Sequence, residues 1–169
     1  MIARYTRPAM GRIWSDENKY GQWLEVELAA AEALAETGEV PRDAARLLRE
    51  HARVSVGRLL EIEREVKHDV IAFTTAVAES MAAAGHGDVS RWFHYGLTSN
   101  DVVDTAQALQ LQQASGLLLE ALEGLASLLR NRAFEFKHAV QIGRTHGVHA
   151  EPITFGLKLA LWYDEARRN

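Results

Sequence analysis

Apolar residues recur three or four positions apart along most of this chain, which is the spacing of amphipathic α-helices rather than of β-strands. The pattern predicts helices over the following ranges: about 16–38, 41–52, 55–66, 69–84, 98–139 and 154–169. Ser15 or Asp16 is expected to cap the first helix and Gly38 to end it. Asp69 stands where the N-cap of the fourth helix is expected. The sequence therefore predicts an all-α fold.

The start of the chain is predicted to be an extended arm over residues 1–14, because Pro8 disfavours helical backbone at Arg7. A small helical domain is expected over residues 1–97. The long helix that follows is expected to begin a central helical bundle, which would occupy residues 98–169.

The helix predicted over residues 98–139 contains no proline and would be about 60 Å long. Its leucines repeat with the spacing of a helical-bundle seam at Leu118, Leu122, Leu125 and Leu129. Such a face must be covered, and residues 1–97 are too few to cover all of it. We expect other copies of the chain, or further chain, to cover it. The last predicted helix has no C-cap, so the sequence is interpreted as the N-terminal part of a larger protein.

Composition narrows the function classes. The formal net charge of -4 provides no basic field, so nucleic-acid binding is not expected. The absence of cysteine excludes disulfides, thiol catalysis and thiolate metal sites. No apolar run approaches the ~20 residues that a membrane-spanning helix needs, so no membrane contact is expected. The first residues also lack the apolar core of a signal peptide.

One polar segment, Gly143–Pro152, interrupts the helical pattern and is predicted to be a loop. It contains His146 and His149, and a neutral imidazole can give or take a proton near pH 7. The alternatives are a structural hydrogen bond for one histidine, or metal binding by both together with Glu151. Nothing in the spacing requires a metal, and none is expected.

Three shorter segments carry candidate binding groups, each with an ordinary structural alternative. Arg4-Tyr5 offers donors for an anion such as phosphate, or is simply a polar arm. Lys67-His68-Asp69 suits proton transfer or anion binding, or is a solvated helix boundary. Thr98-Ser99-Asn100-Asp101 opens the long helix with hydroxyls and free N–H groups, which can bind a carboxylate or only cap the helix.

A metal site is a competing hypothesis. Glu65 with His68, and Glu135 with His138, both match the Glu-x-x-His motif of di-iron helical bundles. Two further glutamates would be needed, and a lysine precedes each histidine, which is electrostatically poor for a dication. The motif is also common by chance.

Taken together, several segments closely resemble the adenylosuccinate lyases, a family of the fumarase/aspartase superfamily. The resemblance runs from Arg4 to Trp162, and it is carried by these segments: Arg4-Tyr5 with Arg7-Pro8, Lys67-His68-Asp69-Val70, His94-Tyr95-Gly96-Leu97-Thr98-Ser99, Asp101-Val102-Val103-Asp104-Thr105-Ala106, and Gly143–Pro152. Asn100 and Ile153 depart from the residues usual in the family. Neither lies at a position that touches the chemistry.

The resemblance implies a cofactor-independent lyase of purine biosynthesis that releases fumarate from adenylosuccinate, giving AMP, and from SAICAR, giving AICAR. It implies catalytic roles for His146 and His68, and substrate-binding roles for Arg4, Tyr5, Lys67, Asp69, Thr98, Ser99 and Thr145. His146 matches the general acid. His68 matches a histidine that positions the purine nucleotide substrate.

The family's catalytic base is a serine in a mobile Gly-Ser-Ser-x-Met-Pro-x-Lys-x-Asn loop, and this sequence contains no such segment. Family members are cytoplasmic homotetramers whose active sites form from three subunits, so this chain alone is expected to be inactive. Two alternatives remain open. One is another lyase of the superfamily, and the other is a non-enzymatic helical bundle for metal binding or assembly.

Overall fold

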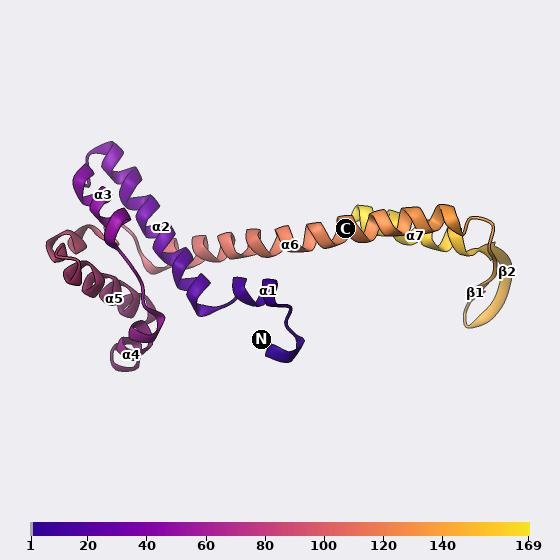
Figure 1. Cartoon of the computed structure of the whole chain (residues 1–169), viewed down its shortest axis with the longest axis horizontal. Helices are drawn as coiled ribbons and strands as arrows, with labels where there is room; N and C mark the ends of the chain where they lie inside the picture. The colour runs from indigo at the N-terminus through magenta and orange to yellow at the C-terminus, as the bar shows by residue number, and fades with distance from the viewer. Residues whose placement is uncertain (1) are drawn as a thin grey trace. The chain divides into compact units, whose positions relative to one another are not determined.

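The computed structural model describes residues 2–169 and confirms the all-α class (Figure 1). Its helices, with the two 3-10 helices η1 and η2, are η1 (Ala3–Tyr5), α1 (Pro8–Ile13), α2 (Asp16–Thr37), α3 (Arg42–His51), α4 (Val56–Val66), α5 (Asp69–Ala83), η2 (Gly87–Trp92), α6 (Ser99–Glu135) and α7 (Phe155–Arg168). One antiparallel hairpin, β1 (Val140–Thr145) and β2 (Val148–Thr154), separates α6 from α7. The chain forms two compact units, of which the first ends at Ala114 and the second is Ser115–Asn169.

Most predicted helix boundaries are confirmed to within a few residues. Ser15 caps α2 by accepting a hydrogen bond from Asn18 N at 3.3 Å. Gly38 ends α2 in the left-handed conformation, with a φ of 84°. Thr154 caps α7 by accepting from Leu157 N at 3.1 Å. Side-chain capping and glycine conformational freedom thus decide the two ends of α2 as the sequence predicts, while the Thr154 cap was not predicted.

The prediction of an extended arm is wrong over most of the described residues 2–14, which form η1 and α1 instead. Arg7 is extended, with φ -66° and ψ 135°, as a residue before proline should be. Pro8 then begins α1, because its fixed φ suits the first position of a helix. Met1 of the predicted arm lies outside the described residues.

The core of the first unit is built around stacked aromatic rings on different elements. Trp23 of α2 meets Phe73 of α5 edge to face, with ring centroids 5.4 Å apart. Phe73 also packs on Phe93, which follows η2, at 5.7 Å. Trp23 and Phe73 are almost completely buried. Because large aromatic side chains dominate core energetics, these contacts fix α2, α5 and the segment after η2 relative to one another.

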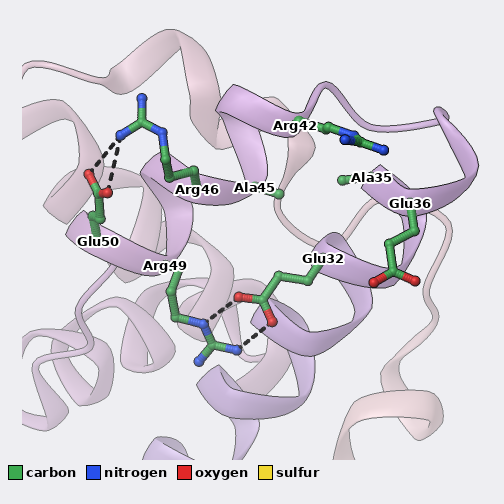
Figure 2. A pocket seen from close by; sticks show the side chains of 8 residues that line it. All are labelled: Glu32, Ala35, Glu36, Arg42, Ala45, Arg46, Arg49 and Glu50. Atoms are coloured by element: carbon green, nitrogen blue, oxygen red, sulfur yellow. Dashed lines mark hydrogen bonds and ion pairs between the residues drawn. The ribbon is translucent and has the colours of Figure 1, made fainter.

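An ion-pair cluster joins α3 to α2 at the surface of the first unit (Figure 2). The Arg49 guanidinium donates to Glu32 Oε1 at 2.7 Å and to Glu32 Oε2 at 2.9 Å, a bidentate pair. It also donates to Glu25 Oε2 at 2.6 Å. The cluster borders a shallow hollow of about 370 Å³. These contacts tie the two helices together.

The leucine seam of α6 is largely exposed within the described residues 2–169. Leu118 is 57% exposed and Leu125 46% exposed, while Leu122 and Leu129 are half-buried. Leu161 of α7 is also 62% exposed. The apolar face predicted from the sequence therefore exists and is open in the single chain. None of the helices in the described part of the chain is long and apolar enough to cross a membrane.

Candidate functional site

Backbone strain coincides with the segments singled out from the sequence. Among the described residues, the non-glycine residues with positive φ are Lys67 (55°), His94 (61°) and His146 (51°). Each lies in a segment that carries the family resemblance. A left-handed conformation is costly for a residue with a side chain, and such strain gathers at functional sites. Geometry and sequence therefore point to the same three places.

The first place is the turn between α4 and α5. Lys67 ends α4 in the left-handed conformation, and its N–H donates to Glu63 O at 2.9 Å. The prediction that Asp69 caps α5 is wrong: His68 Nδ1 accepts from Ile71 N at 3.3 Å, so His68 is the cap. Asp69 instead begins the helix, and its Oδ1 accepts from Val70 N at 2.8 Å.

This cap determines what His68 can offer a ligand. Because Nδ1 accepts a hydrogen bond, the proton of the neutral imidazole lies on Nε2. His68 therefore presents an N–H donor from a half-exposed ring, whose side chain is 46% exposed. A surface hollow of about 420 Å³ lies beside the turn and is lined by Leu60, Glu63, Arg64 and Lys67. The turn thus presents an N–H donor with charges of both signs around it, the cations Arg64 and Lys67 and the carboxylates of Glu63 and Asp69.

The second place is the segment that runs from His94 to the start of α6. Asp101 Oδ2 accepts from the Thr98 backbone N–H at 2.8 Å, so Asp101 reaches back to close the first turn. Within residues 2–169, neither the Thr98 hydroxyl nor the Ser99 hydroxyl has a hydrogen-bond partner. Asp101 therefore caps the helix, and the hydroxyls of Thr98 and Ser99 remain free to donate to a carboxylate at the helix N-terminus.

The third place is the tip of the hairpin, where the predicted loop is wrong. Thr145 pairs with Val148 across a two-residue turn, whose residues His146 and Gly147 have φ values of 51° and 76°. Positive φ at both central positions is the geometry of the tight turn that suits a twisted hairpin. A Cβ at Gly143 would lie 2.7 Å from Glu151 O, so only glycine fits at the bulge beside Arg144. His146 and Thr145 are both exposed at the tip.

Arg4 and Tyr5 lie in η1 at the start of the described chain. The Arg4 guanidinium lies over the Tyr5 ring, with its Cζ 4.8 Å from the ring centroid. Tyr5 is 73% exposed. A guanidinium stacked on an aromatic face keeps its N–H donors free at its edge, where they can bind an oxyanion.

The predicted site residues divide between the two units. Thr145 and His146 belong to the second unit, and the remaining predicted residues belong to the first. Within residues 2–169, no three His, Asp or Glu side chains come together in a way that would hold a metal ion. That statement covers His149 and Glu151, which lie exposed on β2.

A buried pair was missed as a candidate from the sequence. Glu27 of α2 is 1% exposed, and its Oε1 lies 2.6 Å from His94 Nδ1. Burial raises the pKa of Glu27, and the hydrogen bond with His94 opposes that rise. Within the helical pattern of α2, Glu27 resembles any surface glutamate. The only available signal was His94 itself, in the motif that leads to Thr98.

The chain matches known proteins over its whole length. A model of the family described as "Lyase" matches residues 3–169. Adenylosuccinate lyase of Bacillus subtilis (strain 168) is 53% identical, and that of Streptococcus mutans serotype c is 51% identical. Each alignment covers all of this chain and 38% of the relative, so the chain spans well under half the length of the curated relatives it matches.

A solved structure has the same fold. It is β-carboxy-cis,cis-muconate cycloisomerase from Acinetobacter calcoaceticus, with a TM-score of 0.89 and 28% identity over 96% of this chain and 38% of that chain. Similarity of sequence and fold thus agree from one end of the described chain to the other. With nearly every residue covered by the family model, this chain belongs to the lyase family.

Proposed function

We propose that this chain supplies part of the active site of an adenylosuccinate lyase, an enzyme of purine nucleotide biosynthesis. The observation that carries the proposal is the 53% identity with the Bacillus subtilis enzyme over all 169 residues, with the resembling motifs in place. The substrates would be adenylosuccinate, which gives AMP, and SAICAR, which gives AICAR. Both reactions release fumarate.

The reaction is a β-elimination, which needs three kinds of group. A base removes a proton beside a carboxylate, donors hold the resulting doubly charged aci-carboxylate, and an acid protonates the departing nitrogen. Donors must be in place before the charge develops, because reorganising them would cost much of the rate enhancement. The free hydroxyls of Thr98, Ser99 and Thr145 are the donors in this proposal.

The acid is His146 in this proposal. An imidazole is a side chain suited to proton donation near neutrality, and the position of His146 at an exposed hairpin tip leaves its ring open to a ligand. His68 positions the substrate through its Nε2–H. The nucleotide contacts are made by Arg4, Tyr5, Lys67 and Asp69, with Arg4 binding a phosphate. No metal or organic cofactor takes part.

The proposal includes the assembly of the family, a cytoplasmic homotetramer with active sites shared between subunits. The open leucine face of α6 supports it, since exposed apolar surface of this kind is normally covered by association. We also propose domains at residues 1–97 and 98–169, the second beginning the central bundle. The base would come from a serine loop that this sequence does not contain.

A chimera tests the function directly. Residues 1–169 of this chain replace the matching region of Bacillus subtilis adenylosuccinate lyase, and fumarate formation is followed by absorbance with adenylosuccinate and with SAICAR. We expect turnover of both substrates. A well-folded chimera that turns over neither would contradict the proposal.

A second candidate is another lyase reaction of the same family, and the structural similarity to the muconate cycloisomerase favours testing it. The sequence identity of 28% to that enzyme is well below the 53% to the Bacillus subtilis lyase. Offering the chimera a carboxymuconate separates the two. Conversion of the carboxymuconate without release of fumarate from adenylosuccinate would favour the second candidate.

A further inference from the structure

The buried pair of Glu27 and His94 needs a physical explanation that core packing does not give. Glu27 is 1% exposed, and its Oε2 has no hydrogen-bond partner among the described residues. A buried carboxylate is costly unless it is well bonded, and a leucine or methionine of similar size would avoid that cost. The presence of a glutamate here, with one short bond to His94 Nδ1 that is 2.6 Å long, points to a use of that bond beyond stability.

His94 is the residue on which that bond acts. Its backbone is left-handed, with φ 61°, and the residue before it, Phe93, is buried against Phe73. A strained backbone persists only where its surroundings hold it. The ring stack holds one side of His94, and the Glu27 carboxylate holds its imidazole.

The segment after His94 leads directly to the candidate anion-binding hydroxyls. Gly96 makes a second left-handed turn, with φ 75°, and Leu97 packs partly buried against the core. The chain then enters α6, where Thr98 is bonded through its N–H to Asp101 and Val102 is fully buried. The Thr98 and Ser99 hydroxyls are thus placed by the anchored first turns of α6 on one side and by the conformation of the segment 94–97 on the other.

We propose that Glu27 is a positioning residue: by holding the His94 imidazole, it fixes the turn that presents Thr98 and Ser99 to the substrate carboxylate. This inference rests on the proposed lyase function. Glu27 touches no substrate and acts only through His94. Its effect is on the turnover step, because donors that stabilise developing charge must be placed accurately, and a misplacement of about 1 Å can cost on the order of a hundredfold in rate.

Two substitutions in the chimera separate the effect of the length of the Glu27 side chain from the effect of its charge. Glu27→Gln keeps the length of the side chain and an amide group that can hydrogen-bond to His94 Nδ1 in either tautomer, while it removes the charge. Glu27→Asp keeps the charge and withdraws the carboxylate from His94. Glu36→Gln, an exposed glutamate of the same helix, is the matched control. For each variant, kcat per folded protein and KM are measured, with the folded fraction taken from circular dichroism melts.

We expect Glu27→Asp to lower kcat roughly tenfold to a hundredfold, with a smaller change in KM. Glu27→Gln is expected to keep kcat within about threefold of the parent chimera. The reason is that the hydrogen bond to His94 is retained and only its charge is lost. Glu36→Gln should match the parent.

Three results would overturn the inference. The first is a kcat for Glu27→Asp equal to that of the parent. The second is Glu27→Gln more impaired than Glu27→Asp, which would make charge rather than position the important property. The third is activity that falls only in proportion to the folded fraction, which would make Glu27 purely structural. An inactive parent chimera, by contrast, would count against the proposed function itself.

Discussion

Gly156 of α7 lies directly against the backbone of Lys137: a Cβ atom at Gly156 would lie 2.6 Å from Lys137 Cα and 2.5 Å from Ala133 O. The Gly156 N–H also donates to Phe136 O at 3.0 Å. The start of α7 is therefore fastened to the end of α6 at a distance that only glycine allows.

The close approach at Gly156 predicts a loss of stability on substitution. Gly156→Ala in the chimera should destabilise the fold by about 1–3 kcal/mol, because the added methyl group meets backbone atoms that cannot turn away. Gly21→Ala is the control, since nothing lies within 4 Å of a Cβ at that helical position. It should stabilise by up to about 1 kcal/mol. Thermal melts measure both, and equal melting temperatures for the two variants would contradict the contact.

Removing the proposed acid should reduce turnover while leaving binding intact. His146→Asn in the chimera is expected to lower kcat by about 10²–10⁴-fold, the usual contribution of general acid catalysis. Asparagine tolerates the left-handed backbone of this turn, so the hairpin should survive. His138→Gln changes an exposed histidine of the same unit and should leave kcat unchanged. A near-normal kcat for His146→Asn would make His146 structural.

Removing the proposed phosphate ligand should affect binding more than chemistry. Arg4→Ala is expected to raise KM roughly tenfold to a hundredfold, the worth of a hydrogen bond to a charged group. A phosphate lies away from the bond that breaks, so its contact is similar in the ground and transition states. Arg12→Ala, on the exposed side of α1, is the control. A fall in kcat at constant KM would refute the phosphate assignment.

The ion-pair cluster predicts a pH-dependent contribution to stability. The hydrogen bonds from Arg49 lower the pKa of Glu32 below its ordinary value of 4.5. A carboxyl whose folded-state pKa is lowered stabilises the fold above its unfolded value, and this stabilisation is lost as pH falls through the folded-state pKa. Arg49→Met should therefore lower stability near pH 7 by up to about 1 kcal/mol, as for exposed pairs. The deficit should shrink below about pH 4.5.

Melting temperatures of the chimera and of Arg49→Met, measured at low salt from pH 7 down to pH 3.5, follow this deficit. Arg42→Met on the same helix should show no such pH dependence. A deficit that stayed constant in acid would mean that Arg49 acts through packing alone, and a deficit that grew in acid would contradict the prediction.

The 169-residue chain by itself is expected to release no fumarate from adenylosuccinate. Its sequence contains no segment resembling the family's serine loop, so the base and its neighbouring lysine are absent from the reaction centre. Absorbance assays with protein purified from a host that lacks its own adenylosuccinate lyase test this. Clear turnover would show that another group acts as the base.

Periodicity predicted the helices well because it records which faces are buried, and Ser15 and Gly38 marked the ends of α2 through local hydrogen bonding and φ preference. It failed at the hairpin, where turn signals such as Asn-Gly are replaced by His146-Gly147 and a polar strand resembles a loop. It also failed at Glu27, since only the fold decides which glutamate of a helix faces the core. Residue types singled out the candidate segments, the family resemblance supplied their roles, and only the structure showed their backbone strain.

The open leucine face of α6 has a consequence for any measurement of stability. If the proposed assembly covers that face, folding and association are linked by mass action, and the native state gains free energy as protein concentration rises. The melting temperature is then a property of the solution as well as of the sequence. Variants are comparable only at matched subunit concentration, and dilution becomes a way to weaken α6 without changing a residue.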